Sequence, residues 1–424
     1  IRYKLKKKNY SLKNSIYKNW SLFSNFSNLS VLYSLNLLIP FFIYPYLIRV
    51  LGSETYGLVI YAQAIITYFV TLIGFGFNLS GVKLVSANRN NKQEIGKIIS
   101  SILIIKFFLF IISLMFLIFI LFYLPAAEGF EILFIFSMSS VLSELLFPIW
   151  YFQGIEQMGY WTKITLVSRL IYLVLIFLLI QSPDDYLFVP IAVGVGHLIG
   201  SLMSIYIIFF KHRIRFSLQS FQTLKFYFLD SIPLFLSGLS VNIISSNNKF
   251  IIGSFVGMGE VAYYDLADKL RTLFKLPQTI INLTIFPRVS REKNIVFIKQ
   301  MFKITIFVNL ILVSIVLLTS PKIITILAGN EMLPSLSLVS TLIFSILLLA
   351  MKDVFGVQIL IPNGYNKIFT KIILMSLLIY LIQIVLIWTT IGFTSLNLII
   401  STLASELFMV TLMFYYCKKL KLWI

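Results

Sequence analysis

Residues 50–64, VLGSETYGLVIYAQA, recur in altered form at residues 255–269, FVGMGEVAYYDLADK. In both stretches an apolar residue and a glycine end one hydrophobic segment, an acidic residue follows, and aromatic residues begin the next segment. Gly52 matches Gly257 and Ala62 matches Ala267 at one offset of 205 residues, close to half of the 424-residue chain. Self-similarity at a fixed offset predicts two structural repeats of similar size.

The composition indicates whether these repeats lie in water or in a membrane. Hydrophobic residues make up 59% of the chain and charged residues only 12%, and the mean hydropathy is +0.94. A soluble globular protein carries about twice that share of charge, so the sequence predicts an integral membrane protein.

Twelve apolar segments are each long enough to cross a hydrocarbon core of about 30 Å as a helix. They lie near residues 28–50, 57–82, 97–124, 131–153, 161–181, 186–210, 226–252, 260–286, 297–319, 333–360, 367–390 and 394–416. Each repeat then holds six of these segments. Because six is an even number, both repeats enter the membrane from the same side and are related by a pseudo-two-fold axis along the membrane normal. We expect an all-α fold with an N-lobe at 28–210, a cytoplasmic linker at 211–225 and a C-lobe at 226–416, flanked by basic cytoplasmic segments at 1–27 and 417–424.

Charge in the connections predicts the orientation, since cytoplasmic loops collect Lys and Arg. Alternate connections are basic or acidic. The basic group holds Lys83, Arg89, Lys92, Lys97, Lys211, Arg213, Arg215, Arg288, Arg291, Lys293, Lys299, Lys367 and Lys371, and the acidic group holds Glu128, Glu131, Asp184, Asp185, Glu260 and Glu331. Both termini are expected in the cytoplasm, and the net charge of +19 is then a topology signal that requires no nucleic-acid partner.

The eighth predicted helix carries five charged residues on or beside one face: Asp265, Asp268, Lys269, Arg271 and Lys275. Asp265 can pair with Lys269 at i,i+4 and Asp268 with Arg271 at i,i+3, which leaves Lys275 unmatched just before Pro277. A helix that begins only near Leu270 would place the charges in an external loop, which suits Asp265 but not Lys275. We therefore expect Asp268, Arg271 and Lys275 to face a water-lined cavity.

Two further acids lie inside predicted spans. Glu406 is about twelve residues from either end of the last helix, and Glu144 precedes Pro148 in the fourth. Each is interpreted either as a proton or cation site or as a structural partner for a basic group.

Basic residues nearer to helix ends have simpler interpretations. Lys106, Arg169 and Arg49 lie within two or three turns of an end, where snorkelling to the interface is the favoured explanation. Lys249 is expected either to line a vestibule or to anchor the helix at the interface. His197 lies beside Gly196 in a small-residue pattern completed by Gly200, which favours a packing role over a proton relay.

Motifs of catalysis are missing from the sequence. It contains no H-E-x-x-H, no Walker lysine loop, no G-x-S-x-G in a soluble context and no Cys/His cluster, and Cys417 is the single cysteine. We expect a protein that is not an enzyme, holds no metal or cofactor and does not hydrolyse ATP.

Two stretches resemble the polysaccharide transporter family, the Wzx-type O-antigen flippases of the multidrug, oligosaccharidyl-lipid and polysaccharide exporter superfamily. They are LGSETYGLVIYAQAIITYFVTLIGFGFNLSGVKLVS at 51–86, continued by NRNNKQEIGKIISSILIIK, and SIPLFLSGLSVNIISSNNKFIIGSFVGMGEVAYYDLADKLRTLFKLPQTIINLTIFPRVSR at 231–291.

The resemblance implies a flippase of the bacterial inner membrane that moves undecaprenyl-diphosphate-linked oligosaccharides to the periplasmic leaflet by alternating access. It also implies a polysaccharide polymerase and a chain-length regulator as partners, and a cationic interior that binds the diphosphate. Positions that match this interior are Arg49, Lys106, Arg169, Lys249, Arg271 and Lys275, with Asp268 as a polar neighbour and Glu406 and Glu144 as coupling-ion candidates. Asp265 and Asp268 depart from a purely cationic pattern, which suggests a neutral sugar.

Two alternatives remain open at this stage. A drug exporter of the same superfamily would share the fold but should have an acid-dominated cavity. Membrane polysaccharide polymerases and glycosyltransferases share a large external loop. The external connections of this chain are short by comparison.

Overall fold

The computed structural model describes residue 39 and residues 41–423. The predicted basic segment at 1–27 and the first part of the predicted span 28–50 lie outside these residues. All regular secondary structure in the described part of the chain is helical, as expected for an all-α membrane protein.

The helices follow the predicted spans in order. They are the helical segment 41–74, α2 (Phe77–Ala87), α3 (Lys92–Tyr123), α4 (Glu131–Ser137), α5 (Ser139–Leu146), α6 (Ile149–Gly154), α7 (Met158–Leu179), α8 (Phe188–Tyr206), α9 (Phe221–Phe255), α10 (Met258–Glu292), α11 (Ile295–Ala328), α12 (Leu336–Leu342), α13 (Ser345–Lys352), α14 (Asn366–Thr390) and α15 (Ser395–Lys419). Short 3₁₀ turns are η1 (Pro125–Ala127), η2 (Pro183–Leu187) and η4 (Asn330–Ser335), and η3 (Ile207–Lys211) and η5 (Asp353–Leu360) are π-helical.

Within the described residues, nine helical segments are long and apolar enough to cross a membrane. The first of them, Phe41–Ala87, contains the end of the first predicted span and the whole of the second, and Gly52 separates them with a left-handed φ of 76°. The long helices α9 and α10, of 35 residues each, are more polar and correspond to two further predicted spans. Eleven of the twelve predicted spans are therefore represented by helices within the described residues, and residues 41–50 form the described part of the first.

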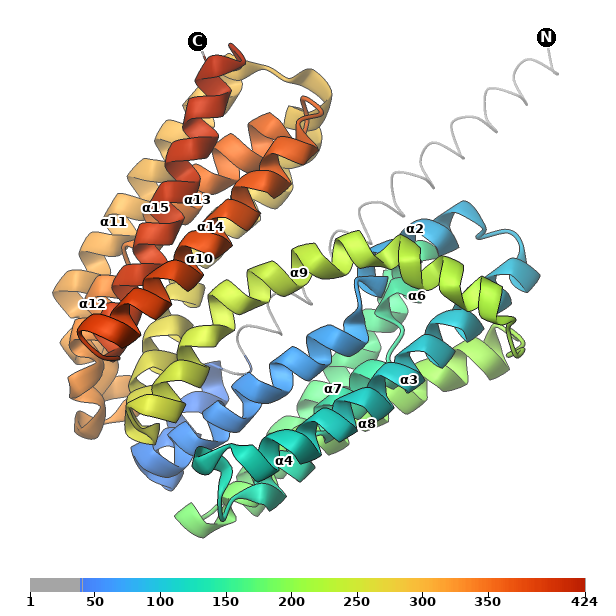
Figure 1. Ribbon diagram of the computed structural model, residues 1–424, viewed down its shortest axis with the longest axis horizontal. Helices are drawn as coiled ribbons and strands as arrows, with labels where there is room; N and C mark the ends of the chain where they lie inside the picture. The colour runs from blue at the N-terminus through green and yellow to red at the C-terminus, as the bar shows by residue number, and fades with distance from the viewer. Residues whose placement is uncertain (1–38, 40, 424) are drawn as a thin grey trace, which may run out of the picture.

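The helices form two bundles that meet at one end and diverge toward the end that carries the C-terminus (Figure 1). The N-lobe contains the described helices up to η3, and the C-lobe contains α9 to α15. Helix α9 packs against both lobes: Ser231 in its first half hydrogen-bonds Ser80 of α2, and Asn248 near its end hydrogen-bonds Thr402 of α15. The boundary predicted at residues 211–225 stays a prediction.

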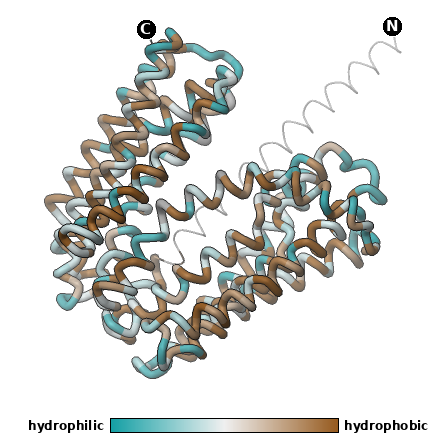
Figure 2. Tube along the Cα trace, in the orientation of Figure 1, coloured by the Kyte–Doolittle hydropathy of each residue, from teal (hydrophilic) through white to brown (hydrophobic). Residues whose placement is uncertain are grey.

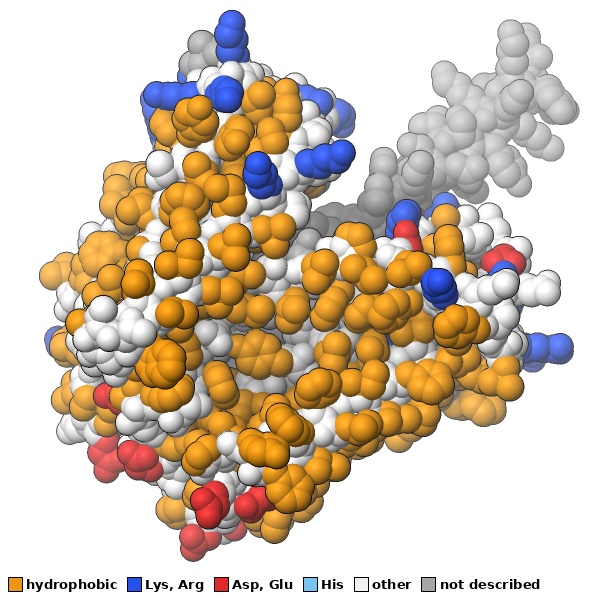
Figure 3. All heavy atoms as spheres, in the orientation of Figure 1, with side chains coloured by type: hydrophobic (Ala, Val, Ile, Leu, Met, Phe, Trp, Pro, Cys, Tyr) orange, Lys and Arg blue, Asp and Glu red, His pale blue; other side chains and the backbone are white. Residues whose placement is uncertain are grey.

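Polarity is segregated along the long direction of the helices. Hydrophilic residues lie at the two ends of each bundle and hydrophobic residues along the helices between them (Figure 2). Acidic side chains gather where the bundles meet, and basic side chains gather at the ends that diverge (Figure 3). We call these the acidic end, with connections 52–54, 124–131, 180–187, 256–260 and 329–335, and the basic end, with connections 88–91, 155–157, 211–220, 293–294 and 361–365.

The two lobes are joined lengthwise where α9 runs antiparallel to the chain at residues 61–80. Hydrogen bonds connect Tyr61 to Ser254 at 2.8 Å, Tyr68 to Asn247 at 3.3 Å and Thr71 to Asn242 at 2.8 Å. A β-carbon on Gly253 would lie 2.1 Å from the Tyr61 ring, so only glycine allows this approach. The interface thus combines polar pairs with close backbone packing, as is usual between membrane helices.

Candidate functional site

Helix α10 places its charged residues inside the protein. It begins at Met258 and continues through Pro277 to Glu292, so the alternative of a helix that starts near Leu270 is wrong. The predicted pairs are confirmed: Asp265 pairs with Lys269, and Asp268 with Arg271 at 2.6 Å. The polar face of this helix is therefore built into the tertiary structure.

Asp265, the residue that suited an external loop best, is only 2% exposed. Its carboxylate accepts hydrogen bonds from Lys249 at 2.8 Å and from the hydroxyl of Tyr56 in the N-lobe at 2.7 Å, in addition to the Lys269 pair. Several donors are needed to offset the cost of burying a carboxylate. Asp265 thereby connects the two lobes near the acidic end.

The pairing continues deeper into the C-lobe. Lys249 also contacts Asp268 at 3.1 Å, so of its two interpretations the pairing contradicts the interface anchor. Arg271 lies 3.9 Å from Glu406. We call Lys249, Asp265, Asp268, Lys269, Arg271 and Glu406 the C-lobe ion cluster. Its three bases and three acids balance, while Oε2 of Glu406 is buried without a hydrogen-bond partner among the described residues.

A second polar group in the C-lobe escaped the sequence interpretation. Asp353 accepts hydrogen bonds from Gln278 and Asn282, each at 2.8 Å, and Asn309 and Gln358 extend this network. Asp353 begins the π-helical turn η5, a feature frequent at functional sites. The adjacent charged residues Lys352 and Asp353 in LLAMKDVFG, residues 348–356, lie inside a predicted span and were the sequence signal that could have indicated this network. Lys275 lies within electrostatic range of Lys352, Asp353 and Glu406.

Lys106 and Glu144 form a buried pair in the N-lobe. Lys106 is 1% exposed and donates to the Glu144 carboxylate at 2.9 Å and to its backbone carbonyl at 2.8 Å. That carbonyl lacks its usual helical partner because residue 148 is a proline without an N–H group. The snorkelling prediction for Lys106 is wrong, and of the two interpretations of Glu144 the structure shows the structural partner.

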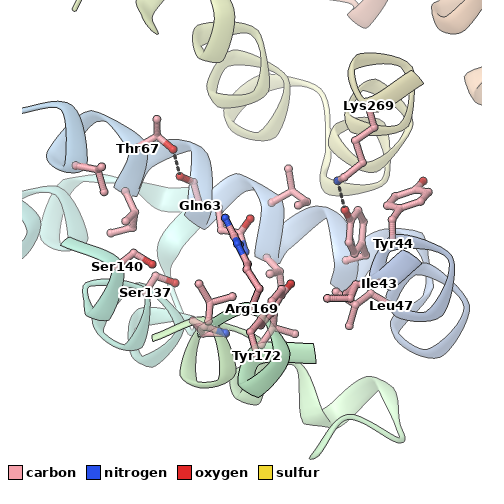
Figure 4. Close-up of a pocket in the computed structure, with 18 residues that line it drawn as sticks. Ile43, Tyr44, Leu47, Gln63, Thr67, Ser137, Ser140, Arg169, Tyr172 and Lys269 are labelled. Carbon is pink, nitrogen blue, oxygen red and sulfur yellow. Dashed lines mark hydrogen bonds between the residues drawn. The ribbon is translucent and has the colours of Figure 1, made fainter. Parts of the chain in front are cut away.

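A cavity of about 300 Å³ lies in the N-lobe at its border with the C-lobe and is called the interlobe cavity (Figure 4). Most of its wall comes from the N-lobe, and Lys269 enters from the C-lobe. Arg169 of α7 projects toward it (Figure 4), and its polar lining also includes Gln63, Thr67, Ser137 and Ser140. The cavity therefore combines two cationic groups with hydroxyl and amide groups.

A second cavity of about 320 Å³ lies within the N-lobe and shares Ser140 and Arg169 with the first. It extends to Glu144 and His197. Arg169 lines both cavities, so the prediction that it snorkels to the interface is wrong.

Gly196 and Gly200, the glycines around His197, pack closely against α7, as their spacing predicted. A β-carbon on Gly196 would lie 2.7 Å from the carbonyl oxygen of Ser168, and one on Gly200 would lie 3.3 Å from the Ser168 side chain. Close packing of α8 on α7 is thereby confirmed.

Arg49 is exposed and does not line either cavity. Its guanidinium donates a hydrogen bond to the carbonyl of Ile326 in α11. Arg49 thus adds a contact between the lobes at the acidic end.

Two helical lobes joined at one end, buried charges and a polar cavity at the border between the lobes define a multi-pass membrane transporter. A family model described as "Polysaccharide biosynthesis protein" matches residues 22–293. The chain belongs to this family, which confirms the resemblance seen in the sequence.

Two relatives cover most of the chain. A "Putative O-antigen transporter" of Escherichia coli (strain K12) is 25% identical over 95% of this chain and 98% of its own length. A protein with the same description from Shigella dysenteriae is 26% identical over 84% of this chain and 90% of its own length.

Solved structures share the fold at low identity. The lipid II flippase MurJ in an inward closed conformation has a TM-score of 0.75 at 14% identity, over 93% of this chain and 87% of that one. An inward-facing multidrug resistance MATE family transporter of the MOP superfamily has a TM-score of 0.70 at 14% identity, over 92% and 95%. The predicted twelve-helix transporter fold is confirmed.

Proposed function

We propose that this protein is a flippase that moves lipid-linked oligosaccharide repeat units across the bacterial inner membrane, with undecaprenyl diphosphate as the lipid carrier. The interlobe cavity carries the proposal, since it places the Arg169 guanidinium beside a set of hydroxyl and amide groups, with Lys269 at its edge held by Asp265 and Tyr56. The O-antigen transporter relatives and the family membership support the same substrate class.

The chemistry of the cavity fits both parts of such a headgroup. The Arg169 guanidinium is suited to bind phosphate oxygens by charge-assisted hydrogen bonds. Gln63, Thr67 and Ser140 offer donors and acceptors to sugar hydroxyls, and the Tyr172 ring in the same wall offers an apolar surface. None of the described residues that line this cavity is acidic, whereas an exporter of cationic drugs is expected to have a cavity dominated by acids.

Among the residues expected to bind substrate, we assign direct contact to Arg169, because it lines both the interlobe cavity and its N-lobe extension. We assign Lys249, Asp268 and Arg271 to the wall of the C-lobe, because their charges are engaged by one another and by Asp265 and Glu406. Lys275 is retained as a candidate for substrate contact in the C-lobe, whereas Arg49 and Lys106 are engaged elsewhere.

Transport by alternating access would require the lobes to separate at the acidic end. The basic end, where the lobes diverge (Figure 1), would face the cytoplasm, so this structure would be the inward-facing state. Lys269 and Asp265 contact Tyr56 across the lobes, and these bonds would break when the protein opens outward.

Glu406 is the coupling residue in this proposal. Its pairing with Arg271 leads through Asp268 and Lys249 to Asp265, which holds Tyr56 of the other lobe. A proton or cation on Glu406 would weaken its hold on Arg271 and redistribute the charges along this chain.

The test is flipping of a labelled undecaprenyl-diphosphate oligosaccharide in proteoliposomes. We expect Arg169→Ala to reduce the rate at least about tenfold, as loss of one charge-assisted contact predicts, and Arg169→Lys to retain part of it. Arg291→Ala, which removes the same charge at an exposed site, is the matched control. Glu406→Gln should abolish the response to an imposed pH gradient while leaving downhill flipping.

Full activity of Arg169→Ala would remove the interlobe cavity from the substrate path. Failure of the folded wild type to flip any of several glycans would favour a small-molecule exporter with the same fold.

A further inference from the structure

A third cavity lies at the basic end of the N-lobe, apart from the interlobe cavity. It has a volume of about 370 Å³, within the range of roughly 300–1,000 Å³ typical of ligand sites. Its walls come from the start of α3, the turn between α6 and α7, and the residues that follow α8. We call it the basic-end pocket.

The lining of this pocket is strongly basic. Arg89, Lys92, Lys211 and His212 contribute to it, together with the amide of Gln157, and none of the described residues that line it is acidic. Just outside, Glu156 pairs with Arg89 at 2.9 Å. The two lysines therefore leave a net positive charge within the pocket.

The basic groups are held in place by neighbouring contacts. Lys92 donates to the backbone carbonyl of His212 at 3.0 Å, and the His212 ring is hydrogen-bonded to the buried Tyr151 hydroxyl at 2.6 Å. The ammonium of Lys211 lies 4.8 Å from the centre of the Tyr160 ring. An ammonium group has three donors, and within the described residues Lys92 uses one of them in this hydrogen bond, which leaves two for a ligand.

The segment behind the pocket is fixed along α3. Ser217 donates its backbone N–H to Ser100 at 3.0 Å, and a β-carbon on Gly96 would lie 2.8 Å from the carbonyl oxygen of Arg215. Such close backbone packing presents a preformed wall, which lowers the entropic cost of binding.

The electrostatics point to an anion. Partial burial and the nearby Lys211 and Lys92 lower the pKa of His212 below its usual value, because both lysines disfavour a further positive charge. Neutral at pH 7, His212 adds a polar ring without repelling the lysines. A phosphate group would neutralise the charge that depresses this histidine.

We propose that the basic-end pocket is a binding site for the phosphate group of an anionic lipid, held by Lys92 and Lys211 at the edge of the membrane. Basic pockets between helices at the cytoplasmic side of membrane proteins are suited to such headgroups. The site is separate from the substrate path and does not depend on the proposed transport function.

Native mass spectrometry of the purified full chain provides the test. The probes are phosphatidylglycerol as the anionic phosphodiester, phosphatidylcholine as a zwitterionic control and inorganic pyrophosphate as a soluble phosphate source. We expect the wild type to retain phosphatidylglycerol in preference to phosphatidylcholine, and Lys92→Gln with Lys211→Gln to weaken this binding about tenfold. The matched control removes two exposed lysines at the basic end of the C-lobe, Lys367→Gln with Lys371→Gln.

The outcomes separate the possible sources. Competition by pyrophosphate would support recognition of the phosphate group itself. Binding of pyrophosphate without phosphatidylglycerol would overturn the lipid assignment and leave a site for free phosphate. Equal losses in both double variants, each with an unchanged melting temperature, would show diffuse surface charge and overturn the pocket. Retention of neither probe by the wild type would also overturn it.

Discussion

The carboxylate of Glu54 accepts a hydrogen bond from the backbone amide of Gly259 at 3.1 Å, and these residues are 205 positions apart. This separation equals the offset between the two sequence repeats, so equivalent positions of the two halves touch each other. Such a contact is expected only close to an axis that relates the halves. The repeated motif therefore forms the place where the two lobes meet at the acidic end.

Gly57→Ala should prevent this contact. A β-carbon at Gly57 would lie 1.8 Å from the carbonyl oxygen of Met258 in the other lobe, and backbone cannot yield as a side chain can. Overpacking costs about 1–3 kcal/mol, so we expect a shift of about fivefold or more away from the state described here. Pulsed EPR between spin labels placed at Glu128 and Glu331 would report longer distances. Gly238→Ala, where a β-carbon meets nothing within 4 Å, should leave the distances unchanged.

Lys106→Met should destabilise the N-lobe strongly. The substitution leaves the Glu144 carboxylate without its buried cation and its backbone carbonyl without a donor, at a cost of about 3–5 kcal/mol. The double variant Lys106→Met with Glu144→Gln should recover part of the loss, since no lone charge remains. Thermal unfolding in detergent measures both, and equal melting temperatures for the wild type and the single variant would contradict the pairing.

Asp265→Asn should weaken the contact between the lobes. It leaves Lys269 without its acidic partner and Lys249 with Asp268 alone, and it weakens the bond from Tyr56, so part of the pairing that offsets the cost of removing these charges from water is lost. We expect a lower melting temperature, partly restored by adding Lys269→Met. Asp184→Asn, at an exposed position of the acidic end, should change the free energy of unfolding by less than about 0.5 kcal/mol. Similar shifts in both variants would argue against a central role for Asp265.

A cysteine at Ser140 should report which side the cavity faces. Ser140 lines both the interlobe cavity and its N-lobe extension, and Cys417→Ser provides a cysteine-free background. We expect a membrane-impermeant maleimide to label Ser140→Cys in inside-out vesicles and much more slowly in right-side-out vesicles. Labelling only from the opposite side would reverse the predicted orientation or state.

The candidate site could be predicted only in part. The pairs within α10 followed from i,i+4 and i,i+3 spacing, because a helix brings such residues together wherever it lies. The partners of Lys249, Lys106 and Glu406 did not follow, and neither did the network around Asp353. Arg169 was expected to snorkel, since distance from a helix end says nothing about which side of the helix faces a cavity.

The sequence by itself determined the number of spans, the separation of charge between the two ends and the presence of two repeats. These properties depend on local composition, because every apolar segment of sufficient length must cross the bilayer. Only the tertiary structure decided which buried charges meet. Asp265 and Tyr56 are 209 residues apart and Lys106 and Glu144 are 38 apart. Such contacts depend on how each helix is rotated and packed against its neighbours, which local composition leaves open.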